Sequence, residues 1–113
     1  MPNFDLILLS LGEDGHTASL FPRSEALKAN SQWVAANHVA NLDTWRLTFT
    51  YPLINAARQI LFMASGDNKA KVVKEIIEDR NPALPATDIH TENVAWYLDR
   101  TAAGLLSRQT LCN

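Results

Sequence analysis

Short apolar segments separated by turns recur along this chain. Residues 4–11 are a nearly continuous apolar run ended by Gly12, which is typical of a strand buried on both faces of a parallel sheet. Residues 59–64 form a second apolar run, closed by Ser65-Gly66, and predict a second strand. Residues 46–50 alternate and contain threonine and phenylalanine, which predicts another strand. Two further strands are predicted at 33–39 and 94–98.

Helices are predicted between these strands. In residues 69–79 the apolar positions recur at one, three and four residues, which is typical of one buried helix face, and Asp67 is placed to cap the helix. Shorter helical segments are predicted at 16–21, 25–29, 52–57 and 100–106, the last capped by Asp99. The alternation of strands and helices predicts an α/β fold with a layered sheet.

Two candidate sites follow directly after predicted strands. In layered α/β sheets, ligands bind beyond the carboxyl ends of the strands. Asp14-Gly15-His16 follows the first apolar run, and Gly66-Asp67-Asn68-Lys69 follows the second. We therefore expect a binding site that combines the two segments.

The first candidate site has the residues for proton transfer. Gly12 and Gly15 allow the backbone to turn sharply and approach a ligand closely. The imidazole of His16 can take a proton from water near neutral pH, and Asp14 is close enough to orient it or to cap a helix. The alternative is that Asp14 is only a cap and His16 a polar surface residue.

Two basic residues are candidates for binding an anion. Lys69 is expected in the first turn of a helix, where backbone N–H groups and the ammonium could share a phosphate. Arg46, at the start of a predicted strand, could grip phosphate with two parallel N–H bonds. Alternatively, Lys69 is an exposed surface lysine and Arg46 an ordinary edge-strand arginine.

Composition and charge narrow the classes of function. The 113 residues suit one domain or part of one, and 47% of them are hydrophobic, enough for a core. A net charge of −2 gives no general attraction for nucleic acid, and the apolar runs are too short to span a membrane. Cys112 has no internal disulfide partner and no secretory leader is visible, so we expect a reducing compartment. The spacing of His16, His38 and His90 predicts no metal site.

Four blocks of sequence resemble one family of sugar-phosphate enzymes. Residues 8–22, Leu-Leu-Ser-Leu-Gly-Glu-Asp-Gly-His-Thr-Ala-Ser-Leu-Phe-Pro, resemble the signature of the 6-phosphogluconolactonases. Residues 46–58, 66–70 and 96–103 are similar to its later blocks, in the same order. The resemblance covers nearly the whole chain, and the first block is the most specific.

The resemblance implies a Rossmann-like, mostly parallel sheet with helices on both faces. It also implies hydrolysis of 6-phospho-D-glucono-1,5-lactone to 6-phospho-D-gluconate, in the oxidative pentose phosphate pathway of the cytoplasm. His16 matches the general base, Asp14 a neighbour that sets the loop, and Arg46 and Lys69 the residues that hold the 6-phosphate. We expect Gly12, Gly15 and Thr17 beside the substrate, and neither a metal nor an organic cofactor.

The chain also departs from the family pattern. Ser10 and Arg23 stand where glycine is usual, and the family's amino-terminal Gly-Gly-Ser-type loop and Asp-Glu-Arg segment do not occur. Residues 1–113 are thus expected to be the carboxy-terminal portion of such a domain, with self-association through exposed sheet edges. The alternatives are a non-catalytic sugar-phosphate-binding fragment and a deaminase-like isomerase, which the absence of an acid in residues 17–22 disfavours.

Overall fold

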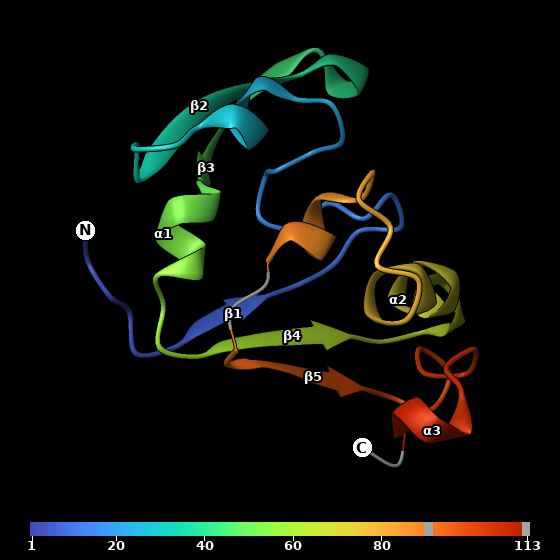
Figure 1. Ribbon diagram of the computed structural model, residues 1–113. Coiled ribbons are helices and arrows are strands. Elements are labelled where there is room, and N and C mark those ends of the chain that lie inside the picture. The colour runs from blue at the N-terminus through green and yellow to red at the C-terminus, as the bar shows by residue number, and fades with distance from the viewer. Residues whose placement is uncertain (90–91, 112–113) are drawn as a thin grey trace.

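The structure, a computed structural model, describes residues 1–89 and 92–111. Its centre is a three-stranded parallel sheet in the order β1-β4-β5, with β1 at Ile7–Leu9, β4 at Ile60–Ala64 and β5 at Val94–Leu98. Figure 1 shows the three strands side by side, with the β2–β3 hairpin and α1 above them, α2 beyond the end of β4 and α3 below β5. The predicted α/β fold with a parallel sheet is confirmed.

A second, two-stranded sheet lies apart from the first. Strand β2, Val34–Val39, pairs antiparallel with β3, Thr44–Phe49, through the 3₁₀ helix η2 at Ala40–Leu42. Helix α1, Tyr51–Asn55, with proline in its first turn, connects this hairpin to the parallel sheet (Figure 1). These strands and α1 lie where the sequence pattern predicts them.

The hydrophobic core lies on one face of the parallel sheet. Phe62 and Ile60 of β4 are fully buried there against Val73 and Ile76 of helix α2, Ala70–Ile77. The fully buried Ile54 brings α1 into the same core. The predicted apolar stripe of α2 is therefore the face that packs on the sheet.

The opposite face of the sheet is exposed in the described residues, so helical cover is found on one face only. Large apolar side chains alternate with the core residues and face outward: Leu6, Leu8, Met63 and Tyr97. The prediction that the first strand is buried on both faces is wrong, because Leu8 is 59% exposed at the free edge of the sheet. The strand is also shorter than predicted.

Three predicted helical features differ in the structure. Residues 16–21 form a turn closed by a bridge between Thr17 and Leu20, because Ala18 adopts a left-handed φ of 50° that no helix contains. Asp67 is not an N-cap, since the 3₁₀ helix η3, Asp67–Lys69, begins with it and α2 follows. Residues 100–106 form consecutive turns.

The remaining helical segments are short. The predicted helical turn at residues 25–29 is the 3₁₀ helix η1, Glu25–Lys28. A further 3₁₀ helix, η4 at Pro85–Asp88, packs on the core side of the sheet, and α3 at Arg108–Leu111 ends the described chain. His90 and Cys112, which entered the predictions on metal binding and redox compartment, lie outside the described residues.

Candidate active site

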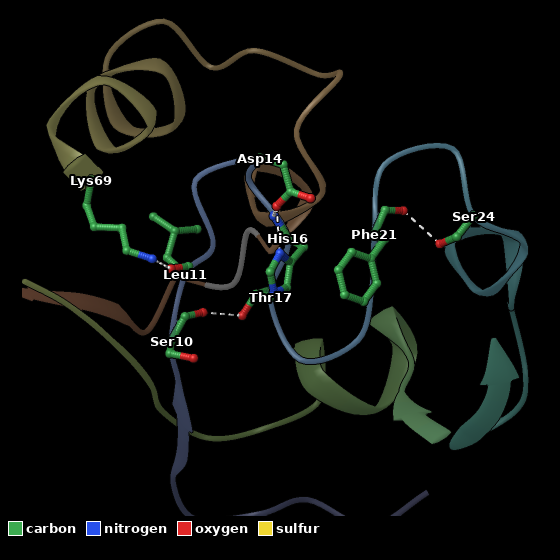
Figure 2. Close-up of polar contacts among 8 residues, drawn as sticks. All are labelled: Ser10, Leu11, Asp14, His16, Thr17, Phe21, Ser24 and Lys69. Atoms are coloured by element: carbon green, nitrogen blue, oxygen red, sulfur yellow. Dashed lines mark hydrogen bonds and ion pairs between the residues drawn. The ribbon is translucent and has the colours of Figure 1, made fainter. Parts of the chain in front are cut away.

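A closed loop joins β1 to the candidate base. The hydroxyl of Thr17 donates to the Ser10 carbonyl at 2.7 Å, and the Gly12 N–H donates to the His16 carbonyl at 2.9 Å. Thr17 is 1% exposed, so its side chain is committed to holding the loop (Figure 2). The loop therefore presents His16 from a fixed backbone.

Asp14 orients the ring of His16. One carboxylate oxygen, Oδ1, lies 2.6 Å from Nδ1 of the imidazole and also accepts the His16 backbone N–H at 3.0 Å (Figure 2). Burial opposes ionisation of this carboxyl group, but the hydrogen bonds and the charge of His16 bring the pKa of Asp14 below its ordinary value. An ionised Asp14 holds the proton on Nδ1 and leaves Nε2 as the ring nitrogen that can accept one.

Both glycines of the loop are required by close contacts. A Cβ on Gly12 would lie 2.2 Å from the His16 ring, so a side chain there would displace the base. Gly15 has a φ of 85° and lies against Leu84, where a Cβ would approach to 2.8 Å. The two positions predicted to let the backbone turn therefore also make room for His16 and for a neighbouring loop.

Phe21 supports the other side of the imidazole. Its ring stacks on that of His16 with centroids 4.3 Å apart and an angle of 23° between planes. The segment that carries Phe21 is tied to β2 by the buried amide of Asn37, which donates to the carbonyl of Ser19 at 2.8 Å and to Ser24 Oγ at 3.0 Å. Sequence reasoning missed both residues, although Asn37 could be found as a polar residue in a strand.

Arg46 reaches the same pocket as His16. It pairs with Asn37 across the hairpin, so both side chains leave the same face of the two strands, toward the loop. A surface pocket of about 400 Å³ is lined by Asp14, His16 and Arg46, with six further residues: Ala18, Ser19, Phe21, Val39, Asn41 and Leu42. Within residues 1–89 and 92–111, the Arg46 guanidinium has no hydrogen bond or ion pair.

Lys69 lies at the same end of the sheet but is engaged differently. Its ammonium donates to the carbonyl of Leu11, at the end of the segment that follows β1 (Figure 2). It does not line the pocket of His16 and Arg46. The structure thus brings three predicted residues around one pocket and places the fourth against the backbone of the loop that carries them.

Asp99 organises the turn that precedes Lys69. Its carboxylate accepts the backbone N–H groups of Gly66 at 3.2 Å and Ala102 at 2.8 Å, and the hydroxyl of Ser65 at 2.9 Å. These bonds, that from Ala102 first, lower the pKa of Asp99 to about 2. The sequence pattern predicts Asp99 as a helix cap, whereas the structure shows it joining the ends of β4 and β5.

Neither a metal-binding group of side chains nor a membrane-spanning helix is found in the described part of the chain. Among these residues, no three His, Cys, Asp or Glu side chains are grouped so that they could hold a metal ion. None of the helices in this part combines the length and apolar character needed to cross a bilayer.

Comparison with known proteins identifies the family. The family model described as Glucosamine-6-phosphate isomerases/6-phosphogluconolactonase matches residues 1–97, most of the chain and all the candidate site residues. The chain belongs to this family. The resemblance of residues 8–22 to the 6-phosphogluconolactonase signature is therefore confirmed at the level of the family.

Several members of this family carry the name 6-phosphogluconolactonase. Those of human and rat are 44% and 43% identical to the chain, each over 95% of it. The solved structure of 6-phosphogluconolactonase from Trypanosoma brucei is 34% identical, covers 94% of the chain and superposes with a TM-score of 0.81. Sequence and fold thus point to the same members of the family.

The chain spans less than half the length of these relatives. It covers 43% of the human and rat proteins and 43% of the T. brucei chain. The match therefore assigns the family and this part of the fold. The activity of the whole domain is a separate question, which depends on the geometry around His16.

Proposed function

We propose that this chain supplies the proton-transfer side of a 6-phosphogluconolactonase active site, which hydrolyses 6-phospho-D-glucono-1,5-lactone to 6-phospho-D-gluconate. One observation carries the proposal: the His16 ring is oriented by Asp14 at 2.6 Å in a pocket that is also lined by Arg46, whose guanidinium has no hydrogen bond or ion pair among the described residues. A base beside an anion-binding cation suits a substrate with an electrophilic carbonyl and a phosphate. The reaction belongs to the oxidative pentose phosphate pathway of the cytoplasm.

The proposed mechanism needs one base and fixed charges. Nε2 of His16 takes a proton from a water molecule as the water oxygen attacks the lactone carbonyl at C1, and Asp14 stabilises the resulting imidazolium. Collapse of the tetrahedral intermediate breaks the bond from C1 to the ring oxygen, which takes the proton held on Nε2 of His16 and so restores the neutral base. The carboxylic acid formed at C1 then loses its proton to solvent. The mechanism uses no metal ion or organic cofactor.

The phosphate end of the substrate would fix the ring against the base. Arg46 can bind phosphate through two parallel N–H groups from within the pocket. Lys69 would add its ammonium from the other side of the loop, since its bond to Leu11 uses one of three N–H protons. Binding energy at this distant group would be used to orient the carbonyl toward His16.

The function is tested by lactone hydrolysis above the spontaneous rate. The chain is assayed alone and together with the part of the human relative that it does not match, produced as a separate polypeptide. Because it spans 43% of that relative, we expect little or no activity alone and clear turnover in the mixture. No turnover in a mixture shown to form a complex would reject the proposal, and release of ammonia from glucosamine 6-phosphate would favour an isomerase.

We further propose that the chain self-associates through its parallel sheet. Strand β1 pairs only with β4 among the described residues, which leaves its other edge free for another strand. The adjoining uncovered face carries Leu8, Met63 and Tyr97 at 59%, 51% and 64% exposure. In water, a free strand edge beside an exposed apolar face favours association with a second copy of the chain.

A charge on the edge strand of this surface should prevent the association. We expect Leu8→Lys to remain monomeric at concentrations where the unmodified chain forms dimers or larger species, measured by sedimentation velocity. Leu47→Lys is the matched control, because Leu47 is 77% exposed but lies on the hairpin. A monomeric unmodified chain, or equal effects of the two substitutions, would show that the β1 edge is not the interface.

A further inference from the structure

A second pocket adjoins that of His16 and Arg46. It has a volume of about 260 Å³ and shares four lining residues with the first: Asp14, Phe21, Val39 and Asn41. Its other side is formed by the segment from Pro22 to Ser24 together with His38 and Ala40. Asp14 therefore lines two adjoining pockets, one with Arg46 in its wall and the other with Arg23.

Arg23 is held in this wall by a tight turn. The backbone N–H of Ser24 donates to the Phe21 carbonyl at 3.2 Å, and the Ser24 hydroxyl donates to the same oxygen at 2.7 Å (Figure 2). Pro22 occupies the second position of the turn and Arg23 the third, with a left-handed φ of 62°. Glycine is the residue that this third position favours. Arg23 therefore occupies a position whose backbone conformation disfavours a side chain.

The charge of Arg23 is available to a ligand. Over the described ranges its guanidinium makes no hydrogen bond or ion pair, like that of Arg46. Asp14, the acidic side chain in the lining of this pocket, has one oxygen engaged by the ring and backbone N–H of His16. The other titratable side chain of this pocket, His38, is paired with Asp43 at 3.3 Å.

Two arginines that have no hydrogen bond or ion pair among the described residues, one in each of the two pockets that share Asp14, suit a ligand with two anionic groups. We propose that Arg23 binds the carboxylate formed when the lactone opens, while Arg46 binds the phosphate at the far end. This inference rests on the proposed function and adds to it a ligand class, open-chain sugar acids phosphorylated at the opposite end. A guanidinium can take a carboxylate through two parallel N–H bonds, and the uncleaved lactone offers no such group.

The test compares two ligands that differ at one end. 6-Phosphogluconate has a phosphate and a carboxylate, whereas glucose 6-phosphate has the phosphate alone. Binding of each to the 113-residue chain is measured by titration calorimetry. We expect Arg23→Gly to weaken 6-phosphogluconate binding by about 10-fold or more, as for loss of a hydrogen bond to a charged group, and to leave glucose 6-phosphate binding unchanged.

Glycine is the informative substitution because it relieves the left-handed backbone, so a loss of binding would not come from a misfolded turn. The matched control is Arg80→Gly, which removes the same charge at another left-handed residue, φ 52°, outside both pockets. It should leave both affinities unchanged.

Three results would overturn the inference. They are equal losses for both ligands in Arg23→Gly, no loss for either, and no binding of either ligand by the unmodified chain. The proposed function fails separately. One outcome would support the binding site and reject the hydrolase. In it, Arg23→Gly weakens binding of 6-phosphogluconate but not of glucose 6-phosphate, and the mixture of the chain with the missing part of the human relative does not hydrolyse lactone.

Discussion

Replacing His16 with alanine should lower kcat/KM for lactone hydrolysis by about 10²- to 10⁴-fold, the range that a positioned general base contributes. The physical reason is the pairing of Nδ1 with Asp14 at 2.6 Å, which leaves Nε2 as the proton acceptor. Without the imidazole, water must attack the carbonyl unassisted, although Arg46 still binds the phosphate. The measurement is lactone disappearance, corrected for spontaneous hydrolysis, in the mixture of the chain with the part of the human relative that it does not match.

Two further variants separate catalysis from packing at this position. His16→Gln keeps a planar side chain against Phe21 but has no titrating nitrogen, so it should lose as much activity as alanine. Glu13→Gln removes the neighbouring exposed carboxylate of the same loop and should retain activity, in contrast to Asp14→Asn. Equal rates for the His16 variants and the unmodified protein would remove His16 from the mechanism.

The largest effect on stability is expected at Phe62. Its side chain is fully buried at the centre of β4 and stacks on Trp96 of β5 with ring centroids 4.3 Å apart. Phe62→Ala should lower the free energy of unfolding by about 3–5 kcal/mol, because it removes buried apolar surface and leaves a cavity. That is a large share of the roughly 5–15 kcal/mol that stabilises a typical domain. Urea denaturation followed by circular dichroism measures the change.

The next residue along the strand provides the control. Met63 points to the opposite, uncovered face of the sheet and is 51% exposed, so Met63→Ala should change the free energy of unfolding by no more than about 0.5 kcal/mol. Both variants are compared at low protein concentration to avoid self-association. Similar losses for the two substitutions would mean that the face carrying Met63 is also packed in solution.

Several elements could be predicted because their signals are local. Strand β4 is a short apolar run closed by glycine, and α2 has its apolar residues on one face, so neighbouring residues determine both. The turn at residues 16–21 could not be predicted in this way. It depends on the left-handed backbone of Ala18 and on the bond from Thr17 to the Ser10 carbonyl, which compete with helix formation.

The candidate site likewise has a part that the sequence predicts and a part that only the tertiary structure shows. The sequence by itself determined the family and the proximity of Asp14 and His16, because two residues in one tight loop meet whatever the rest of the chain does. Only the tertiary structure decided that Arg46 shares their pocket while the Lys69 ammonium binds the Leu11 carbonyl, 58 residues away in the chain. Such contacts depend on how the hairpin and α2 pack, and no local pattern encodes that distance.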